Sequence, residues 1–196
     1  MTKPEFTTNW FKSDKQREWR KQLAHLVGKN AQTLEIGSYE GRSAIWTADY
    51  LQNSLTTCVD PFTTNQVLSR FVANTKAYRK AGRISLRRGY STAKLAEMIA
   101  VKNEFDFIYL DGSHEAIMVL SDATMAFQCL KVGGVMCFDD YTWNAPDCHV
   151  RPRAMIDSFL TAAWPFIEVL HKEKQVWIKK TRCVREFMRE SMENVQ

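Results

Sequence analysis

The segment 33–43, with the sequence TLEIGSYEGRS, constrains the fold of this chain more than any other. Residues that favour a strand lead into Glu35, glycines follow at Gly37 and Gly41, and an amphipathic run begins at Ser43. This order predicts a buried strand, a tight loop and a helix N-terminus. That arrangement holds small anionic or nucleotide ligands in many α/β proteins.

The spacing of the glycines restricts which ligand the loop can hold. The dinucleotide fingerprint G-x-G-x-x-G needs a second glycine near the first, so that the backbone can approach a pyrophosphate. Here Ser38 and Tyr39 occupy that part of the loop. A ligand without a pyrophosphate, but with a carboxylate, an amine and a ribose, fits better. S-adenosylmethionine is the common ligand of that description.

Strand-like and helix-like segments alternate along the rest of the chain. A strand at 33–36 precedes a helix at about 43–52, and Ser13 is placed to cap an earlier helix that ends near Gly28. We expect strands at 55–59, 84–87, 105–110 and, after a turn at Gly133 and Gly134, 135–138; helices at about 67–80, 91–100, 116–130 and 154–163; and hairpin strands at 166–170 and 175–178. The alternation predicts a doubly wound, largely parallel α/β sheet.

Residues that can carry chemistry recur where the predicted strands end. Glu35, Asp60, Gly89, Asp111 and Asp139 each fall at a carboxyl end. In an open parallel sheet, ligands bind outside those ends. The pattern therefore predicts a single ligand-binding rim.

Five motifs resemble, in the same order, those of class I S-adenosylmethionine-dependent methyltransferases: TLEIGSYEGRS, CVDPF, RRGYS, FDFIYLDGSH and LKVGGVMCFDDY. The resemblance is closest to small O-methyltransferases of the catechol type and to sugar O-methyltransferases that carry DGSH and DDY. It implies a Rossmann-like seven-stranded sheet with a C-terminal antiparallel hairpin. It also implies one domain over 1–196, with an N-terminal helical extension (1–30) and a basic C-terminal tail (180–196).

The resemblance also implies a cofactor site. Its residues would be Glu35, Gly37, Ser38, Tyr39, Gly41 and Ser43 around the methionine part, Asp60 at the ribose, Gly89 and Ser91 at the adenine, and Asp111 beside them. Two alternatives stay open from the residues alone. Glu35 could pin amides of its own loop, and Asp60 could shape the turn before Pro61. Ser91 is also placed to cap the helix that it begins.

Three carboxylates, Asp111, Asp139 and Asp140, follow the fourth and fifth strands of the parallel set. With no cysteine beside them, they favour a hard cation, with Mg²⁺ first and Mn²⁺ or Ca²⁺ next. Catechol-type enzymes hold their metal at these positions with asparagine as the last ligand, so Asp140 agrees instead with the sugar-modifying relatives. The alternative is that the three aspartates bond loop amides and cap the next helix.

His114 lies three residues after Asp111, where catechol-type enzymes have a catalytic lysine. An imidazole with a pKa of about 6.5 suits a general base at neutral pH. We therefore expect His114 and Asp111 to be catalytic, with capping of the helix after Glu115 as the alternative for His114. Tyr141, Trp143 and Arg151 follow in the loop where an acceptor would lie.

Composition sets the remaining expectations. The chain has 196 residues and a net charge of +5, no run of about 18 apolar residues that could span a membrane, and no apolar leader at its N-terminus. We expect a cytoplasmic protein. Its five cysteines have no C-x-x-C pair and so do not indicate a disulfide framework or a thiolate zinc site, and we expect Cys58 and Cys137 to be reduced core residues. The excess positive charge lies near the C-terminus. We expect a solvated basic tail there, not a nucleic-acid site; its residues are Lys179, Lys180, Arg182, Arg185 and Arg189.

The expected activity is methyl transfer from S-adenosylmethionine to a hydroxyl of a sugar or glycan, with metal assistance and a histidine base. A catechol or phenylpropanoid acceptor is the alternative within this class. A metal- or nucleotide-binding protein that does not methylate, or a non-catalytic partner subunit, would be compatible with the same fold. The expected partners are a small-molecule or glycan acceptor and a second copy in a homodimer, with no nucleic acid.

Overall fold

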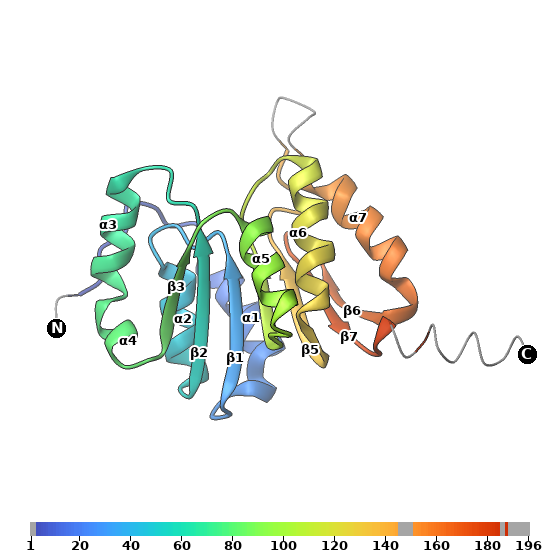
Figure 1. Ribbon diagram of the computed structural model, residues 1–196, viewed down its shortest axis with the longest axis horizontal. Coiled ribbons are helices and arrows are strands. Elements are labelled where there is room, and N and C mark those ends of the chain that lie inside the picture. The colour runs from blue at the N-terminus through green and yellow to red at the C-terminus, as the bar shows by residue number, and fades with distance from the viewer. Residues whose placement is uncertain (1–2, 145–150, 185–186, 188–196) are drawn as a thin grey trace, which may run out of the picture.

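The computed structural model describes residues 3–144, 151–184 and 187. Its strands are β1 (Ala31–Ile36), β2 (Ser54–Asp60), β3 (Ile84–Arg88), β4 (Phe105–Leu110), β5 (Leu130–Phe138), β6 (Ile167–Lys172) and β7 (Val176–Lys180). Together they form a sheet in the order β3-β2-β1-β4-β5-β7-β6 (Figure 1). β1 to β5 are parallel, and β7 is antiparallel to β5 and β6. The predicted seven-stranded, mostly parallel sheet with an antiparallel C-terminal hairpin is confirmed.

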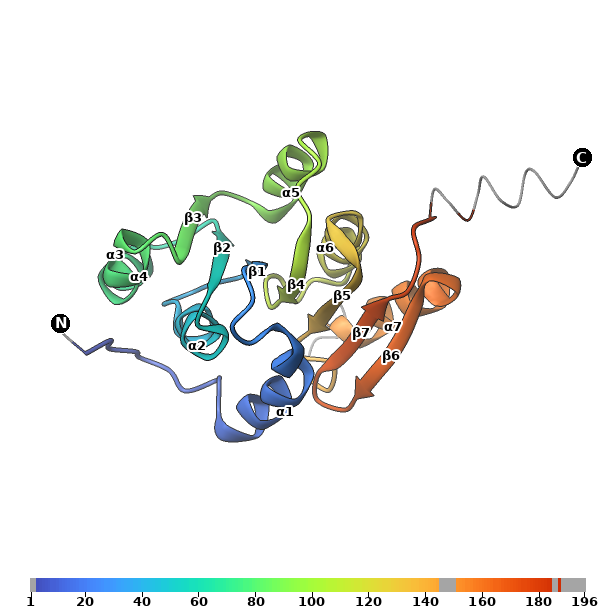
Figure 2. The same ribbon diagram turned by 90° about the horizontal axis from the view of Figure 1, so that it is seen from below.

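Helices cover both faces of this sheet (Figure 2). They are α1 (Ser13–Leu23), α2 (Arg42–Leu51), α3 (Asn65–Asn74), α4 (Lys76–Lys80), α5 (Ser91–Ala100), α6 (Ala116–Gln128) and α7 (Pro152–Ala163), with 3-10 turns η1 (Ala24–Leu26) and η2 (Trp164–Phe166). The chain builds outward from β1 to β3 and then returns to β4 on the other side of β1. This reversal between β1 and β4 is the switch point at which open α/β sheets bind ligands.

Trp19 anchors α1 to the sheet. Its side chain is fully buried and meets Phe11, Trp46, Phe107, Tyr109 and Trp177 edge to face, with ring centroids 4.6–5.7 Å apart. Its Nε1 donates a hydrogen bond of 3.0 Å to Oε1 of Gln175, so the indole nitrogen is satisfied inside the core. The N-terminal extension is therefore a packed layer over β4, β5 and β7.

Two elements differ from the sequence expectation in extent. The helix expected at about 67–80 is broken at buried Thr75, whose hydroxyl donates to the carbonyl of Phe71 at 2.6 Å. Such a bond back to the preceding turn competes with the helical pattern. The strand expected at 135–138 begins at Leu130 and includes Gly133 and Gly134, with a register shift against β4.

The two predicted serine caps are wrong. Lys12 and Tyr90 hold the N-cap positions of α1 and α5, and neither side chain makes a capping hydrogen bond. Ser13 and Ser91 are the first helical residues instead. Sequence spacing alone could not distinguish these neighbouring positions. The N-cap is the last residue with an extended backbone before the helix begins, and that position depends on the backbone conformation.

The basic tail also needs a correction at Lys180. This lysine is buried, and its Nζ donates to the carbonyls of Phe127 (3.0 Å), in the last turn of α6, and Leu130 (2.7 Å), the first residue of β5. It is therefore part of the fold and not of a solvated tail. Arg185 and Arg189, like Cys148, lie outside the described residues. The described cysteines Cys58, Cys129, Cys137 and Cys183 are free thiols, as expected, and no described helix is long and apolar enough to cross a membrane.

We expect Trp19→Ala to lower the free energy of unfolding by about 3–5 kcal/mol, because it empties the centre of an aromatic cluster. Urea denaturation measures this loss. Trp164→Ala is the matched control, since that ring is 75% exposed, and it should change stability by no more than about 0.5 kcal/mol. Equal losses in the two variants would contradict the anchoring role of Trp19.

Candidate active site

The ends of β1, β2, β4 and β5 meet at one rim of the sheet. Backbone hydrogen bonds join them there: Gly37 donates to Val59 (2.9 Å), Asp111 to Ile36 (2.9 Å) and Asp139 to Leu110 (3.0 Å). The loop after β1 is thereby held against both neighbouring strands. The structure thus brings the cofactor loop and the acidic residues to the single rim that the strand ends predicted.

Gly37 allows the closest approach in this rim. Its φ is +86°, and a Cβ at this position would lie 1.9 Å from the carbonyl oxygen of Asp111. Gly41 has a φ of +84°, and its Cβ would lie 2.8 Å from Cγ2 of Thr75. Both positions therefore require glycine, for backbone conformation and for space.

Glu35 is a buried carboxyl group beneath this loop. Burial raises its pKa to about 8, while the neighbouring hydroxyls of Ser43 and Ser38 act in the opposite direction. Its Oε1 is buried and has no hydrogen-bond partner. A buried unsatisfied carboxyl oxygen is costly, and a donor such as the amine of a bound ligand would remove that cost. Glu35 therefore fits a cofactor role, while no described loop amide bonds to it.

Asp60 holds the cofactor loop from the neighbouring strand. Its carboxylate accepts the N–H of Tyr39 (2.9 Å) and the N–H of Phe62 (2.7 Å). Both of these residues have positive φ, 46° and 50°, so Asp60 stabilises two unusual backbone conformations. The turn-shaping alternative is therefore present in the structure. Each oxygen also keeps acceptor capacity for a ribose hydroxyl, so the two roles are compatible.

The predicted adenine residues lie beside Asp60. The N–H of Gly89 donates to the carbonyl of Asp60 at 3.0 Å, and Ser91 begins α5 directly after. The predicted cofactor residues thus form a continuous band along the ends of β1, β2 and β3. Asp111 is the member of the set that lies farther along, at the end of β4.

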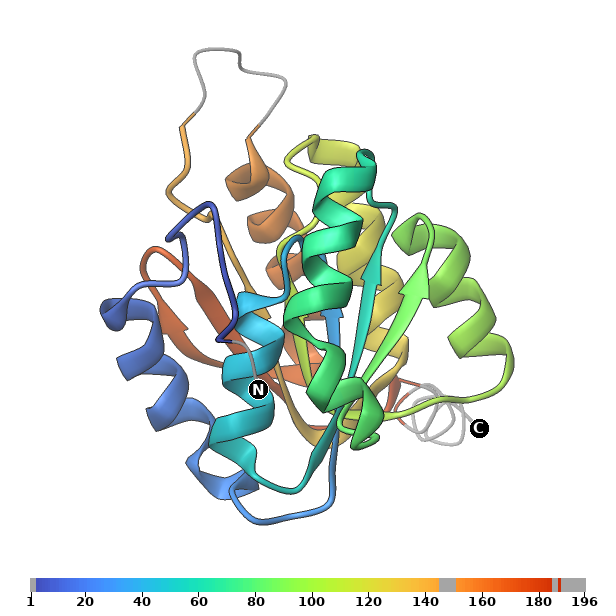
Figure 3. The same cartoon turned by 90° about the vertical axis from the view of Figure 1, so that its left-hand side faces the viewer.

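A cleft with about 430 Å³ of open space lies over the loop after β1. One wall is formed by the segment before α1, which includes Phe6, Thr8 and Trp10. This segment runs beside α2 (Figure 3) and is tied down by Glu40, which accepts both the N–H and the hydroxyl of Thr7 at 2.7 Å. From the sequence, Trp10 and Phe11 could either cover the active site or mediate a dimer, and both residues line this cleft.

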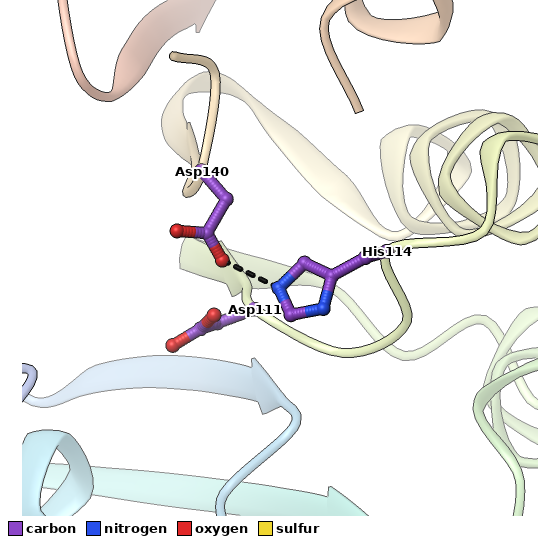
Figure 4. A group of neighbouring side chains, drawn as sticks. All are labelled: Asp111, His114 and Asp140. Carbon is purple, nitrogen blue, oxygen red and sulfur yellow. Dashed lines mark hydrogen bonds and ion pairs between the residues drawn. The ribbon is translucent and has the colours of Figure 1, made fainter. Parts of the chain in front are cut away.

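The acidic residues divide into two groups. In the first, Nε2 of His114 lies 2.6 Å from Oδ2 of Asp140 (Figure 4). One ligand atom from each of Asp111, His114 and Asp140 can be chosen so that all lie within 4.8 Å of one another. Among the described residues, this is the group whose ligand atoms lie close enough together to hold a cation.

Asp139 belongs to the second group. Its Oδ2 accepts from both Nζ of Lys15 and the hydroxyl of Tyr109, and its Oδ1 accepts the N–H of Asp140 at 2.8 Å. The Tyr109 hydroxyl also lies 2.8 Å from Oδ2 of Asp111. Of the three metal ligands expected from sequence, Asp111 and Asp140 therefore lie in the first group, whereas Asp139 pairs with Lys15 and Tyr109.

The charges of this rim shift its protonation equilibria. Burial raises the pKa of Asp111 well above its ordinary value, and the carboxylates of Asp139 and Asp140 raise it further, whereas Lys15 and Tyr109 act against the rise. The hydrogen bond that His114 donates to Asp140 raises the pKa of His114, against a smaller effect of burial. A bound cation would favour ionised carboxylates and compete for Asp140, so these residues fit a divalent ion.

The residues expected around the acceptor have separate positions. The Trp143 ring stacks on His114, with centroids 4.4 Å apart, and is 40% exposed, so it can offer an aromatic face. Tyr141 is instead buried, and its hydroxyl donates to Asp157 at 2.9 Å. Arg151 is exposed. The capping alternative for His114 is not seen, since Glu115 is the N-cap of α6.

Known proteins share this sequence pattern. A family described as "Methyltransferase domain" matches residues 34–141, more than half of the chain. The chain belongs to this methyltransferase family. A search of curated proteins finds no significant match.

Solved structures show the same fold for this methyltransferase-family chain. MycE from the mycinamycin biosynthetic pathway, in complex with Mg, SAH and mycinamycin VI, aligns with a TM-score of 0.65 at 17% identity, over 91% of this chain and 51% of that chain. An O-methyltransferase from Bacillus cereus with SAH aligns at 0.66 and 21%, over 86% and 82%. SAH-bound PaMTH1 from Podospora anserina aligns at 0.59 and 20%, over 78% and 72%.

These similarities confirm the class I S-adenosylmethionine-dependent methyltransferase fold that the motifs indicated. The chain spans about half the length of MycE. At these identities the likeness concerns the fold, and the assignment of individual site residues depends on the geometry described above.

We expect Gly37→Ala to destabilise the protein by at least about 2 kcal/mol more than Gly133→Ala. Both glycines have positive φ, but only the Gly37 position lacks space for a Cβ. The same variant should lose S-adenosylmethionine binding, because the loop would be pushed from β4. Thermal unfolding and calorimetric titration measure the two effects. Equal stability of the two variants, with cofactor affinity retained, would show that the close approach is not required.

Proposed function

We propose that this protein transfers the methyl group of S-adenosylmethionine to a hydroxyl of a sugar or glycan, with a divalent cation and a histidine base. The observation that carries the proposal is the position of Asp111. It lines the cleft over the cofactor loop and also the neighbouring cleft that holds His114, Asp139 and Asp140. A donor in the first cleft and an acceptor at the second would therefore meet at this residue.

The cofactor would occupy the band from Glu35, Gly37, Ser38, Tyr39, Gly41 and Ser43 through Asp60 to Gly89 and Ser91, with Asp111 at its end. Glu35 would accept the methionine amine, which satisfies its unpartnered oxygen. The N-terminal end of α2, with Ser43, would hold the methionine carboxylate, because free N–H groups and the helix dipole favour an anion there. Asp60 would accept the ribose hydroxyls.

The reaction is an in-line displacement. A new bond forms between the acceptor oxygen and the methyl carbon, the bond from that carbon to sulfur breaks, and sulfur keeps the electron pair as a neutral thioether. When bound, S-adenosylmethionine supplies the electrophilic methyl group and a divalent cation acidifies the acceptor hydroxyl. Asp111 and Asp140 would hold the cation with His114 beside them, and Nε2 of His114 would take the acceptor proton.

The acceptor assignment is supported by two observations. DGSH and DDY resemble the sugar-modifying relatives, and MycE, a structural neighbour, is solved with mycinamycin VI. The partly exposed ring of Trp143 suits the apolar face of a sugar, although it would also suit a phenolic ring. A catechol or phenylpropanoid acceptor is therefore the second candidate. The single domain over 1–196, the cytoplasmic location and the homodimer belong to this proposal as well.

An acceptor panel tests the proposal. Purified protein with labelled S-adenosylmethionine and Mg²⁺ should methylate rhamnosides or related glycosides in preference to catechols. EDTA should abolish turnover, and added Mg²⁺ should restore it, while cofactor binding survives because its residues, Asp111 apart, lie in a separate band. Full turnover in EDTA would remove the cation from the mechanism. Cofactor binding without transfer to any hydroxyl would favour a non-methylating protein.

Loss of the imidazole tests the proposed base. His114→Ala should lower kcat by about 10²–10⁴-fold, the usual contribution of a positioned general base. Because the hydrogen bond to Asp140 raises the pKa of His114, the wild-type rate should increase with pH as the imidazole loses its proton. The variant should lack this rise. His171→Ala is a control, since His171 lies on the edge strand β6 and pairs with Glu18 and Glu173, not with a rim carboxylate. A normal rate in His114→Ala would assign the proton to another group.

A further inference from the structure

Lys15 introduces a fixed positive charge into the acidic rim. Its ammonium pairs with Oδ2 of Asp139, a carboxylate whose side chain is 2% exposed, while the lysine side chain itself is 18% exposed. The same oxygen accepts the Tyr109 hydroxyl. Exposed ion pairs contribute little to stability. This pair is largely removed from water, so the charge of the Lys15 ammonium acts on neighbouring groups with little screening.

The fold gives Lys15 little freedom to leave. It lies one helical turn before Trp19 on α1, so the two side chains share the face that packs on the sheet. Trp19 is held by the aromatic cluster of β4 and β7. Lys15 also lines the cleft over the cofactor loop, together with Tyr109 and Asp111. The ammonium is therefore positioned between the proposed cofactor site and the proposed cation site.

We infer that Lys15 is the built-in counter-cation of the acidic rim, and that it weakens the binding of a divalent cation and confines that cation to the side formed by Asp111, His114 and Asp140. The inference rests on the cation site of the proposed function. Its physical basis is Coulombic. The Lys15 ammonium, paired with Asp139, offsets the charge of one of the three neighbouring carboxylates. It also repels a divalent cation that comes within a few ångströms of it.

The surroundings of Lys15 keep it charged. Burial acts to lower its pKa, but the charge and hydrogen bond of Asp139, with further contributions from Asp111 and Asp140, outweigh burial and raise the pKa. Lys15 thus remains an ammonium group at neutral pH and cannot act as the base. Its role is to position Asp139 and to set the charge of the rim.

Manganese binding without cofactor or acceptor tests this inference, with free Mn²⁺ measured by electron paramagnetic resonance. Lys15→Met should bind Mn²⁺ at least about tenfold more tightly than the wild type. Lys15→Gln, which can still donate a hydrogen bond to Asp139, should also bind more tightly and serves if the first variant does not fold. Lys15→Arg should stay within about threefold of the wild type, because it keeps the charge.

Lys21→Met is the matched control, since Lys21 lies on the same helix, its side chain is 70% exposed, and among the described residues it pairs with Glu18 alone, at 3.9 Å. Its manganese affinity should equal that of the wild type. Unchanged or weaker binding in folded Lys15→Met and Lys15→Gln would overturn the inference, as would the absence of manganese binding in all five proteins. The methyl-transfer proposal is judged separately, because the acceptor panel does not depend on these affinities.

Discussion

The close contact between the loop after β1 and the end of β4 is the constraint on which the rest of the site depends. It exists because Gly37 has no side chain: a Cβ there would lie 1.9 Å from the carbonyl oxygen of Asp111. Through this contact, the loop predicted to hold the cofactor and the carboxylate predicted to act in chemistry become neighbours. Asp60 reinforces the loop from the other side by accepting the N–H of Tyr39.

The acidic rim beyond this contact is balanced internally. Asp139 is paired with Lys15 and Tyr109, while Asp140 is paired with His114. Each carboxylate therefore has a donor before any cation binds, which reduces the repulsion that the three would otherwise feel. The two pairs are not equivalent. His114 and Asp140 are partly exposed, whereas Asp139 is buried. The exposed pair is the one that a ligand can rearrange at lower cost.

The elements with strong periodicity were predictable from the sequence, and those that depend on distant contacts were not. The parallel strands and the rim residues Glu35, Asp60, Asp111 and Asp139 followed from apolar runs ending in polar residues. The break at Thr75 and the N-caps at Lys12 and Tyr90 did not, because single residues decide them through local geometry. Lys15 and Tyr109 had usable signals in retrospect. Lys15 is four residues before a buried tryptophan, and Tyr109 is two before Asp111 on the same strand face.

The sequence by itself determined the fold class, the family and the set of residues at the rim, because strand periodicity and the glycine loop are local properties of the chain. The tertiary structure alone decided how the rim residues pair. Lys15 and Asp139 are 124 positions apart, and the packing of Trp19 against β4 and β7 brings the ammonium to that carboxylate. Of the three aspartates predicted to bind one metal, Asp139 is paired with Lys15, whereas Asp111 and Asp140 lie with His114 in a more open group. Charge balance in a buried rim depends on proximity in three dimensions and not on spacing along the chain.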